Sequence, residues 1–272
     1  MFCKGKIKMN LSEKKLFLFD IDGTLSVGNT LFDGSMDLLN YINSVGGRAY
    51  YITNNSTNST DSYIEKFARW NIKTTANLFV TAGYVSMLYL KEHFPDEKVF
   101  VLGTKSYVKE LKKNALNITE TPDDDVKCVL VAFDNELTYK KTEYACELLS
   151  TNNIPYLATN PDLCCPAPFG FIPDCGSICS MIDNCVGRTP EYLGKPNKIL
   201  VDMCLADSGF TKEQTLVVGD RLYTDIACGI NGGTDTCAVL TGETTREEIA
   251  SSQYKPTYTF ENVRELLNAC KQ

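Results

Sequence analysis

The segment at residues 16–25 constrains the fold more than any other part of this chain. Four apolar residues, Leu-Phe-Leu-Phe, are followed by Asp-Ile-Asp-Gly-Thr-Leu. A short apolar run that ends in a turn signal is typical of a strand buried on both faces, as in a parallel sheet covered by helices. Asp20 would then lie at the carboxyl end of the strand, where open α/β sheets bind ligands.

Two carboxylates this close repel each other, so Asp20 and Asp22 favour a cation site or a phosphate-transfer site at the strand end. Gly23 lets the chain leave the strand in a tight turn. Taken as an isolated tetrapeptide, Asp-Ile-Asp-Gly fits an ordinary acidic turn equally well.

The order of apolar segments predicts one α/β block interrupted by another. Strands are expected at residues 16–19, 49–52, 79–80, 215–218 and 236–240, with helices at 35–44, 61–70, 81–93, 197–208, 224–231 and from 262. Between them lie expected strands at 98–102, 129–133 and 155–158, helices at 106–113 and 139–150, and a loop over 161–177. Alternating strands and helices indicate parallel sheets. The predicted fold is therefore α/β, with a Rossmann-like doubly wound parallel-sheet core in residues 1–94 and 187–272 and a smaller inserted α/β domain in residues 95–186.

The charge and hydropathy of the chain exclude several classes of partner. A net charge of -7 argues against a nucleic-acid surface, which needs clustered Lys and Arg. No apolar stretch reaches the length of a membrane span, and no apolar segment of a secretory signal follows the first lysines. We expect a cytoplasmic protein, with Met9 as a second candidate start.

Twelve cysteines raise the question of disulfides or zinc. Disulfide scaffolds are small secreted domains, so we expect reduced, mostly buried thiols. The alternative is a metal site, although no Cys-x-x-Cys pair occurs. It would use the clustered residues Cys164, Cys165, Cys175, Cys179 and Cys185.

Polar residues follow the second predicted strand as Thr53-Asn54-Asn55. Their side chains and backbone N–H groups can donate hydrogen bonds to a phosphate. Considered alone, this segment is more simply a polar loop. Lys195 stands between Gly194 and Pro196 before a helix, where an ammonium can neutralise phosphate charge, although a single lysine is more often a surface residue.

A second acidic strand end is predicted at Gly219-Asp220, with Asp225 five residues later near a helix start. Magnesium takes oxygen ligands and commonly only one or two carboxylates. Asp20, Asp220 and the backbone carbonyl of Asp22 could supply such a site, with Asp225 in support. Asp225 also fits an ordinary helix N-terminal residue.

The four segments around Asp20, Thr53, Lys195 and Asp220 resemble, in order and content, the motifs of the haloacid dehalogenase superfamily. Too few residues separate Asp20 from Thr53 for an inserted domain, whereas a long stretch separates Thr53 from Lys195. An insertion there resembles the second cap type of that superfamily. The branch most similar contains the nitrophenyl, phosphoglycolate, pyridoxal and bacterial nucleotide phosphatases.

The resemblance implies a phosphatase that hydrolyses a small phosphorylated metabolite. Asp20 would be the nucleophile that forms an aspartyl-phosphate, and Asp22 the general acid and base. Thr53 and the backbone N–H groups around Asn54 and Asn55 would hold the phosphoryl oxygens. Lys195 would neutralise the transferring charge. The cofactor would be Mg²⁺, with the ligand set Asp20, Asp22, Asp220 and Asp225.

Substrate choice would lie in the cap, because the four motifs recognise only phosphate and metal. The loop from Asn160 to Ser177 resembles the substrate-facing cap loop of this branch. Asp162 and Phe169 are therefore candidate substrate contacts, with Phe171 as a second aromatic. Cys164 and Cys165 stand where pyridoxal phosphatases carry a histidine, which disfavours pyridoxal phosphate. The resemblance also suggests a homodimer through the cap.

Two other functions compete with phosphate hydrolysis. A phosphomutase would also use an aspartyl-phosphate, but mutases of the superfamily usually carry their cap between the first two motifs. A non-catalytic phosphometabolite-binding protein would not need Asp20, Asp22, Lys195 and Asp220 together. We therefore expect a Mg²⁺-dependent phosphomonoesterase.

Overall fold

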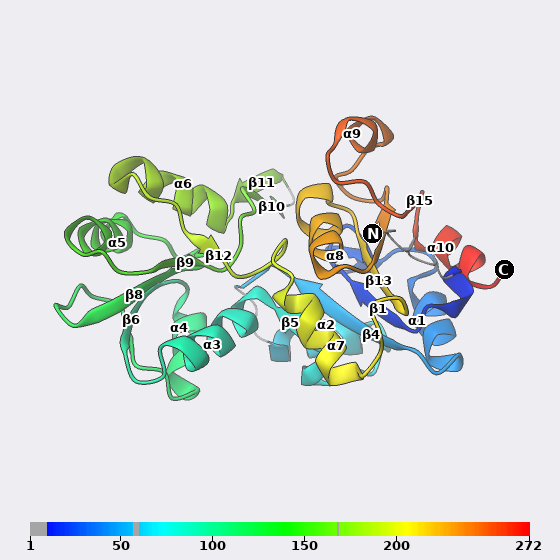
Figure 1. Ribbon diagram of the computed structural model, residues 1–272, viewed down its shortest axis with the longest axis horizontal. Coiled ribbons are helices and arrows are strands. Elements are labelled where there is room, and N and C mark those ends of the chain that lie inside the picture. Colours follow the sequence, from blue (N-terminus) through cyan, green and yellow to red (C-terminus); the bar gives the residue numbers. More distant parts are fainter. Residues whose placement is uncertain (1–9, 57–59, 168) are drawn as a thin grey trace, which may run out of the picture. The chain divides into compact units, whose positions relative to one another are not determined.

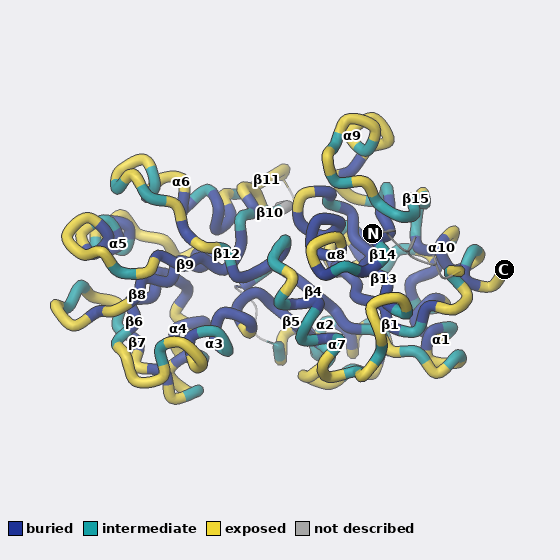
Figure 2. The backbone as a smooth tube through the Cα atoms, viewed as in Figure 1, coloured by how far each residue is buried: buried dark blue, intermediate teal, exposed yellow. Residues whose placement is uncertain are grey.

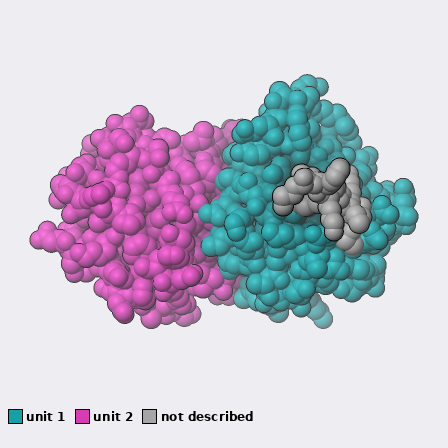
Figure 3. Space-filling view, in the orientation of Figure 1, with its two compact units in different colours: residues 1–52, 66–79, 196–272 teal, residues 53–65, 80–195 magenta. Residues whose placement is uncertain are grey.

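The computed structural model describes residues 10–56, 60–167 and 169–272, and it has α/β architecture (Figure 1). Met9 lies outside the described residues. The strands of both main sheets run through the buried parts of the chain (Figure 2). The described residues of 1–52, 66–79 and 196–272 form unit 1, and those of 53–65 and 80–195 form unit 2 (Figure 3). The predicted α/β class is confirmed.

Unit 1 is built on a six-stranded parallel sheet with the order β15-β14-β13-β1-β4-β5. Its strands are β1 (Leu16–Phe19), β4 (Arg48–Thr53), β5 (Phe79–Thr81), β13 (Thr215–Gly219), β14 (Asp235–Val239) and β15 (Tyr258–Phe260). The central strand β1 pairs in parallel with β13 on one side and β4 on the other. All four β1 side chains are fully buried, as expected for a strand covered on both faces.

Helices and two short hairpin strands complete unit 1. The α-helices are α1 (Ser35–Ser44), the second part of α2 (Thr60–Arg69), α7 (Ile199–Ser208), α8 (Ala227–Gly232), α9 (Arg246–Ser251) and α10 (Val263–Cys270). Short 3₁₀ and π turns are η1 (Leu11–Glu13), η2 (Ala76–Leu78) and η3 (Leu222–Ile226), and the hairpin is β2 (Ser26–Val27) with β3 (Thr30–Leu31). Helix α1 packs on α10, α7 contacts β1, and α8 contacts β13 and β14. These contacts bury the apolar strands of the sheet.

Unit 2 contains a five-stranded parallel sheet with the order β12-β9-β8-β6-β7. Its strands are β6 (Lys98–Leu102), β7 (Ile118–Thr119), β8 (Val126–Val131), β9 (Tyr156–Ala158) and β12 (Glu191–Tyr192). Its helices are α3 (Ala82–His93), α4 (Lys105–Lys113), α5 (Tyr139–Thr151) and α6 (Cys175–Val186). Figure 1 shows α5 and α6 on one face of this sheet and α3 and α4 on the other. Phe100 and Val129 pack in one core cluster with Leu148 of α5 and Ile178 of α6.

The prediction of a loop over 161–177 is wrong. Strands β10 (Cys164–Ala167) and β11 (Gly170–Pro173) form an antiparallel hairpin there, and α6 begins at Cys175. Asp174 caps α6 by accepting the Cys175 N–H, and residues 175, 178, 179 and 182 are buried at helical spacing. The high content of Pro, Gly and Cys concealed this amphipathic pattern.

The helix predicted at 224–231 is also different in detail. The chain forms the π turn η3 over Leu222–Ile226 before α8 begins at Ala227. The Ile226 N–H donates to the Arg221 carbonyl, five residues back, at 3.2 Å. Such turns are rare in proteins, and those that occur often lie at functional sites. None of the helices in the described part of the chain has the length and apolar character that a membrane crossing requires.

Candidate active site

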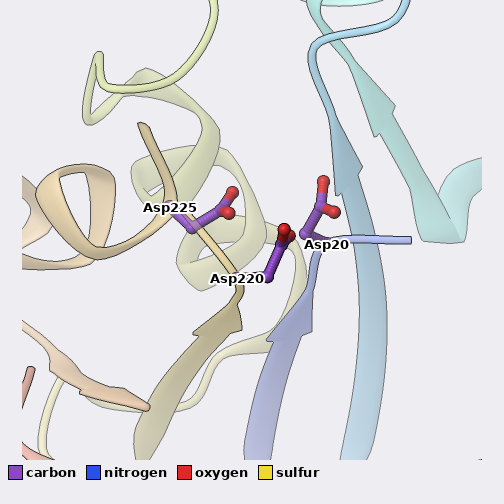
Figure 4. Close-up of side chains that lie close together, drawn as sticks. All are labelled: Asp20, Asp220 and Asp225. Atoms are coloured by element: carbon purple, nitrogen blue, oxygen red, sulfur yellow. The ribbon is translucent and has the colours of Figure 1, made fainter. Parts of the chain in front are cut away.

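Two aspartates lie side by side at the carboxyl edge of the unit 1 sheet. Strands β1 and β13 are parallel neighbours with Phe19 opposite Val218, and each strand leads directly into an aspartate. Asp20 follows β1, and its N–H donates to the Val218 carbonyl at 2.9 Å. Asp220 follows β13 after Gly219. Parallel pairing therefore brings together two carboxylates far apart in sequence, as Figure 4 shows.

Asp225 completes the acidic group from the π turn η3 (Figure 4). Its Oδ2 accepts the backbone N–H of Arg221 at 3.0 Å, which orients the carboxylate. Among the described residues, Asp20, Asp220 and Asp225 are the one group of three that could share a metal ion, with ligand atoms within 4.8 Å of one another. All three side chains are buried.

This carboxylate group fits a divalent cation. Burying several carboxylates together costs free energy through desolvation and mutual repulsion, which a cation relieves. The donors are oxygens only, which suits a hard ion such as Mg²⁺ better than a metal that prefers sulfur or nitrogen. The geometry of Asp20, Asp220 and Asp225 is therefore that of a magnesium-type site.

Asp22 lies outside this group. Its side chain is exposed, and its Oδ1 accepts the ammonium of Lys66 at 2.9 Å. The backbone turns sharply here, since Gly23 has φ of +92° and its N–H donates to the Ser26 carbonyl at 2.8 Å. The roles expected of Asp22 remain predictions, and its carboxylate is on the solvent side of the turn.

Thr53 is the last residue of β4, and Asn54 and Asn55 follow it in unit 2. The Asn55 N–H donates to Oγ1 of Thr53 at 3.2 Å. The Asn54 side chain is buried and bonds with both backbone groups of Lys195, accepting from its N–H at 2.8 Å and donating to its carbonyl at 3.0 Å. Lys195 itself is buried, in contrast to an ordinary surface lysine.

The two substrate candidates of the hairpin region differ in exposure. Asp162 is buried, and its Oδ2 accepts from the amides of Asn54 at 2.7 Å and Asn160 at 3.0 Å. Phe169 is 81% exposed and Phe171 is 61% exposed. Asp162 is thus part of an internal hydrogen-bond network, whereas the two aromatic rings are accessible.

The cysteines in the described residues are free thiols. Cys164 and Cys185 are exposed, whereas Cys175 and Cys179 are buried with their Sγ atoms 4.0 Å apart. Among the described residues, these cysteines do not form a group of three potential metal ligands.

The comparisons with known proteins decide the family. Residues 17–117 match the family model described as haloacid dehalogenase-like hydrolase, and residues 192–266 match a model described as HAD-hydrolase-like. An acid sugar phosphatase of Staphylococcus aureus is 33% identical over 257 residues, which covers 94% of this chain and 98% of that protein. The chain belongs to the haloacid dehalogenase-like hydrolases.

Two solved structures support this placement of the hydrolase. A 4-nitrophenylphosphatase of Thermotoga maritima is 35% identical with a TM-score of 0.89, covering 96% of this chain and 98% of that one. A glycerol phosphate phosphatase of Mycobacterium tuberculosis in complex with magnesium is 25% identical with a TM-score of 0.88, covering 97% and 80%. The predicted family, and the predicted class of phosphatase acting on phosphomonoesters, are confirmed.

One segment of this hydrolase that was not predicted from the sequence holds Asp220 in place. The backbone N–H of Glu243 donates to Asp220 Oδ2 at 2.9 Å, and Thr24 Oγ1 donates to Oδ1 at 3.3 Å. Thr241 Oγ1 donates to the Gly23 carbonyl at 2.6 Å, which ties the same segment to the turn after β1. A signal was present, because Thr-Gly-Glu-Thr follows the predicted strand at 236–240 and so returns to the same sheet edge.

Proposed function

We propose that this hydrolase is a Mg²⁺-dependent phosphomonoesterase that cleaves small phosphorylated metabolites through an aspartyl-phosphate on Asp20. The observation that carries the proposal is the buried group of Asp20, Asp220 and Asp225 at the carboxyl ends of β1 and β13. The magnesium complex of the related glycerol phosphate phosphatase supports the choice of ion.

The reaction would proceed in two displacements. An Asp20 carboxylate oxygen attacks phosphorus, and the bond from phosphorus to the ester oxygen breaks while Asp22, as a carboxylic acid, protonates that oxygen. Asp22, now a carboxylate, takes a proton from water as the water oxygen attacks the phosphoryl group. The bond from phosphorus to Asp20 then breaks and inorganic phosphate leaves.

The remaining groups would bind and orient the phosphate. Thr53 and the backbone N–H groups of Asn54 and Asn55 would donate to the phosphoryl oxygens, and the Lys195 ammonium would offset their charge. A magnesium ion held by Asp20, the Asp22 carbonyl, Asp220 and Asp225 would supply further charge neutralisation at the phosphate.

The substrate class is a small phosphorylated sugar or polyol. The Staphylococcus aureus relative is an acid sugar phosphatase, and the Mycobacterium tuberculosis relative is a glycerol phosphate phosphatase. The exposed rings of Phe169 and Phe171 would contact the organic part of the substrate. Cys164 and Cys165 carry thiols, so neither supplies the imidazole that the pyridoxal phosphatases use there.

Hydrolysis of p-nitrophenyl phosphate with Mg²⁺, with EDTA and by the Asp20→Asn variant tests this function. We expect turnover with Mg²⁺ and its loss in the other two cases, with the melting temperature of the variant close to that of the wild type. Turnover by Asp20→Asn at the wild-type rate would refute the nucleophile. A panel of sugar phosphates, glycerol phosphate, phosphoglycolate, nucleoside monophosphates and pyridoxal phosphate then ranks the substrates by kcat/KM.

A further inference from the structure

The side-chain amide of Asn54 binds the backbone of Lys195 as a peptide group would. Its Oδ1 accepts the Lys195 N–H at 2.8 Å, and its Nδ2 donates to the Lys195 carbonyl at 3.0 Å. Both residues are buried. Two bonds to the same residue fix the direction as well as the position of the backbone from which the lysine side chain starts.

Asp162 holds the Asn54 amide in the orientation that pairs with Lys195. Its Oδ2 accepts from Asn54 Nδ2 at 2.7 Å, and an ionised carboxylate can only accept hydrogen bonds. The nitrogen of the amide must therefore face Asp162, which leaves Oδ1 for the Lys195 N–H. The Lys195 backbone requires the same orientation, because its N–H can only donate and its carbonyl can only accept, so Asp162 reinforces the pairing of Asn54 with Lys195.

Asp162 is in turn fixed by the residues that lead into and out of the β10–β11 hairpin. Asn160 Nδ2 donates to Asp162 Oδ2 at 3.0 Å and to Asp174 Oδ1 at 3.0 Å. Thr159 Oγ1 donates to Asn160 Oδ1 at 2.9 Å. Asp174 caps helix α6. A continuous buried network thus runs from the start of α6 to the Lys195 backbone.

Gly194 allows Lys195 to come this close. A Cβ atom on Gly194 would lie 2.6 Å from Asn54 Oδ1 and 2.5 Å from the Thr159 carbonyl oxygen. The Gly194 N–H also donates to that carbonyl at 2.7 Å. The chain therefore passes between Thr159 and Asn54 with no room for a side chain.

We propose that Asn54 is a positioning residue for Lys195 and that Asp162 holds the Asn54 amide in place. The inference rests on the proposed function, in which the Lys195 ammonium neutralises the transferring phosphoryl group. It also changes the expected role of Asp162, from a contact to the substrate to a contact that holds the amide of Asn54 against Lys195. Small misplacements of a catalytic group lower rates by about tenfold to a hundredfold.

A double-mutant cycle separates this role from a merely structural one. We expect Asn54→Ala to lower kcat/KM for p-nitrophenyl phosphate by about tenfold to a hundredfold. In a Lys195→Ala background the same change should lower it by less than about twofold, because the group that Asn54 positions is already absent. Asp162→Asn keeps the side-chain size. It should lower kcat/KM by less than Asn54→Ala does, and it should have almost no effect in the Lys195→Ala background.

Equilibrium binding provides a second readout that does not need turnover. In the Asp20→Asn background with Mg²⁺, calorimetry with inorganic phosphate should show equal weakening by Asn54→Ala, by Lys195→Ala and by the two together. Asn152→Ala is the matched control, since it removes amide bonds to Leu148 and Thr151 elsewhere in unit 2. It should leave both readouts unchanged.

The outcomes distinguish failure of this inference from failure of the proposed function. If the wild type lacks Mg²⁺-dependent turnover, or Asp20→Asn retains it, the proposed function fails. If that test succeeds but the losses from Asn54→Ala and Lys195→Ala multiply, Asn54 does not act through Lys195 and the positioning role is refuted. Circular dichroism and melting temperatures of each variant show whether a loss of activity comes from unfolding. If Asn54→Ala unfolds, the same cycle is run with Asp162→Asn, and losses that multiply with that of Lys195→Ala refute the positioning role.

Discussion

The carboxylate of Asp220 lies against the backbone of Gly242. A Cβ atom on Gly242 would lie less than 3.0 Å from Asp220 Oδ2, and real Cβ atoms essentially never make contacts that short. The neighbouring Glu243 N–H holds the same oxygen at 2.9 Å. The segment after β14 therefore determines where one member of the acidic group lies.

Replacing Gly242 by Ala should weaken metal binding. The added methyl group must displace the Asp220 carboxylate, and loss of such supporting contacts costs about tenfold to a hundredfold in metal affinity. Titration of activity against Mg²⁺ concentration measures the change. Gly103→Ala is the control, because its Cβ would meet the nearest atom, in the Tyr107 ring, at 3.2 Å. Unchanged Mg²⁺ dependence in Gly242→Ala would show that metal binding does not depend on the position that the Asp220 carboxylate takes against Gly242.

The buried pair of Lys14 and Asp235 should contribute strongly to the stability of unit 1. Lys14 is fully buried, and its Nζ donates to Asp235 Oδ2 at 2.6 Å. Asp235→Asn leaves the ammonium buried without its counter-charge, so we expect a loss of about 3 kcal/mol in the free energy of unfolding. Urea denaturation measures it. Asp202→Asn, which breaks the exposed pair with Lys198, should cost less than about 1 kcal/mol. Equal losses in the free energy of unfolding of the two variants would show that burial does not increase the contribution of the Lys14–Asp235 pair.

The stability of the fold should decrease at alkaline pH. Burial raises the pKa of Cys270 from 9.0 to about 11 and that of Cys128 from 9.0 to about 12. Burial and the hydrogen bond to Asp207 raise the pKa of Tyr50 from 10.0 to about 12. The folded state keeps protons that the unfolded chain releases, so this stability is complete below about pH 9 and is lost between about pH 9 and 12.

Urea midpoints measured from pH 8 to pH 11 test the sign of this dependence. Cys270→Ala should reduce the slope between pH 9 and 11, because it removes one of the groups whose pKa differs between the two states. A midpoint that rises over this range would contradict the assignment.

Thiol reactivity should follow burial. At pH 8 iodoacetamide should modify the exposed Cys164 and Cys185 in the native protein. Cys128 and Cys270 should react only after unfolding, since they are buried and their raised pKa leaves little thiolate. Peptide mapping by mass spectrometry identifies the modified residues. Rapid native modification of Cys128 would show that its strand is accessible.

Phe169→Ala tests the substrate role of the hairpin. The ring is 81% exposed, so its removal should change the melting temperature little. If the ring contacts the substrate, KM should rise severalfold for p-nitrophenyl phosphate while kcat is retained. Tyr139→Ala is the control, as that ring is 85% exposed elsewhere in unit 2. An equal KM in the two variants would show that the Phe169 ring does not contact the substrate.

Local sequence patterns were sufficient to predict the sheets and the position of the acidic residues. The apolar runs before Asp20 and Asp220 predicted buried parallel strands, and both strands lie in the unit 1 sheet. These predictions succeeded because a continuous apolar run bounded by Gly and Asp has few alternatives to a buried strand. Cys-rich α6 was missed because cysteine and glycine obscured an apolar period of 3.6 residues.

The sequence alone therefore determined the family, the α/β class and the ends of the strands that carry Asp20 and Asp220, since these depend on local order along the chain. Only the tertiary structure decided the direction of individual side chains. It directed Asp22 toward Lys66, placed Asp162 in a buried network and brought Asn54 against Lys195. Those contacts join residues distant in sequence, and packing and hydrogen bonding select them only after the strands and helices have assembled.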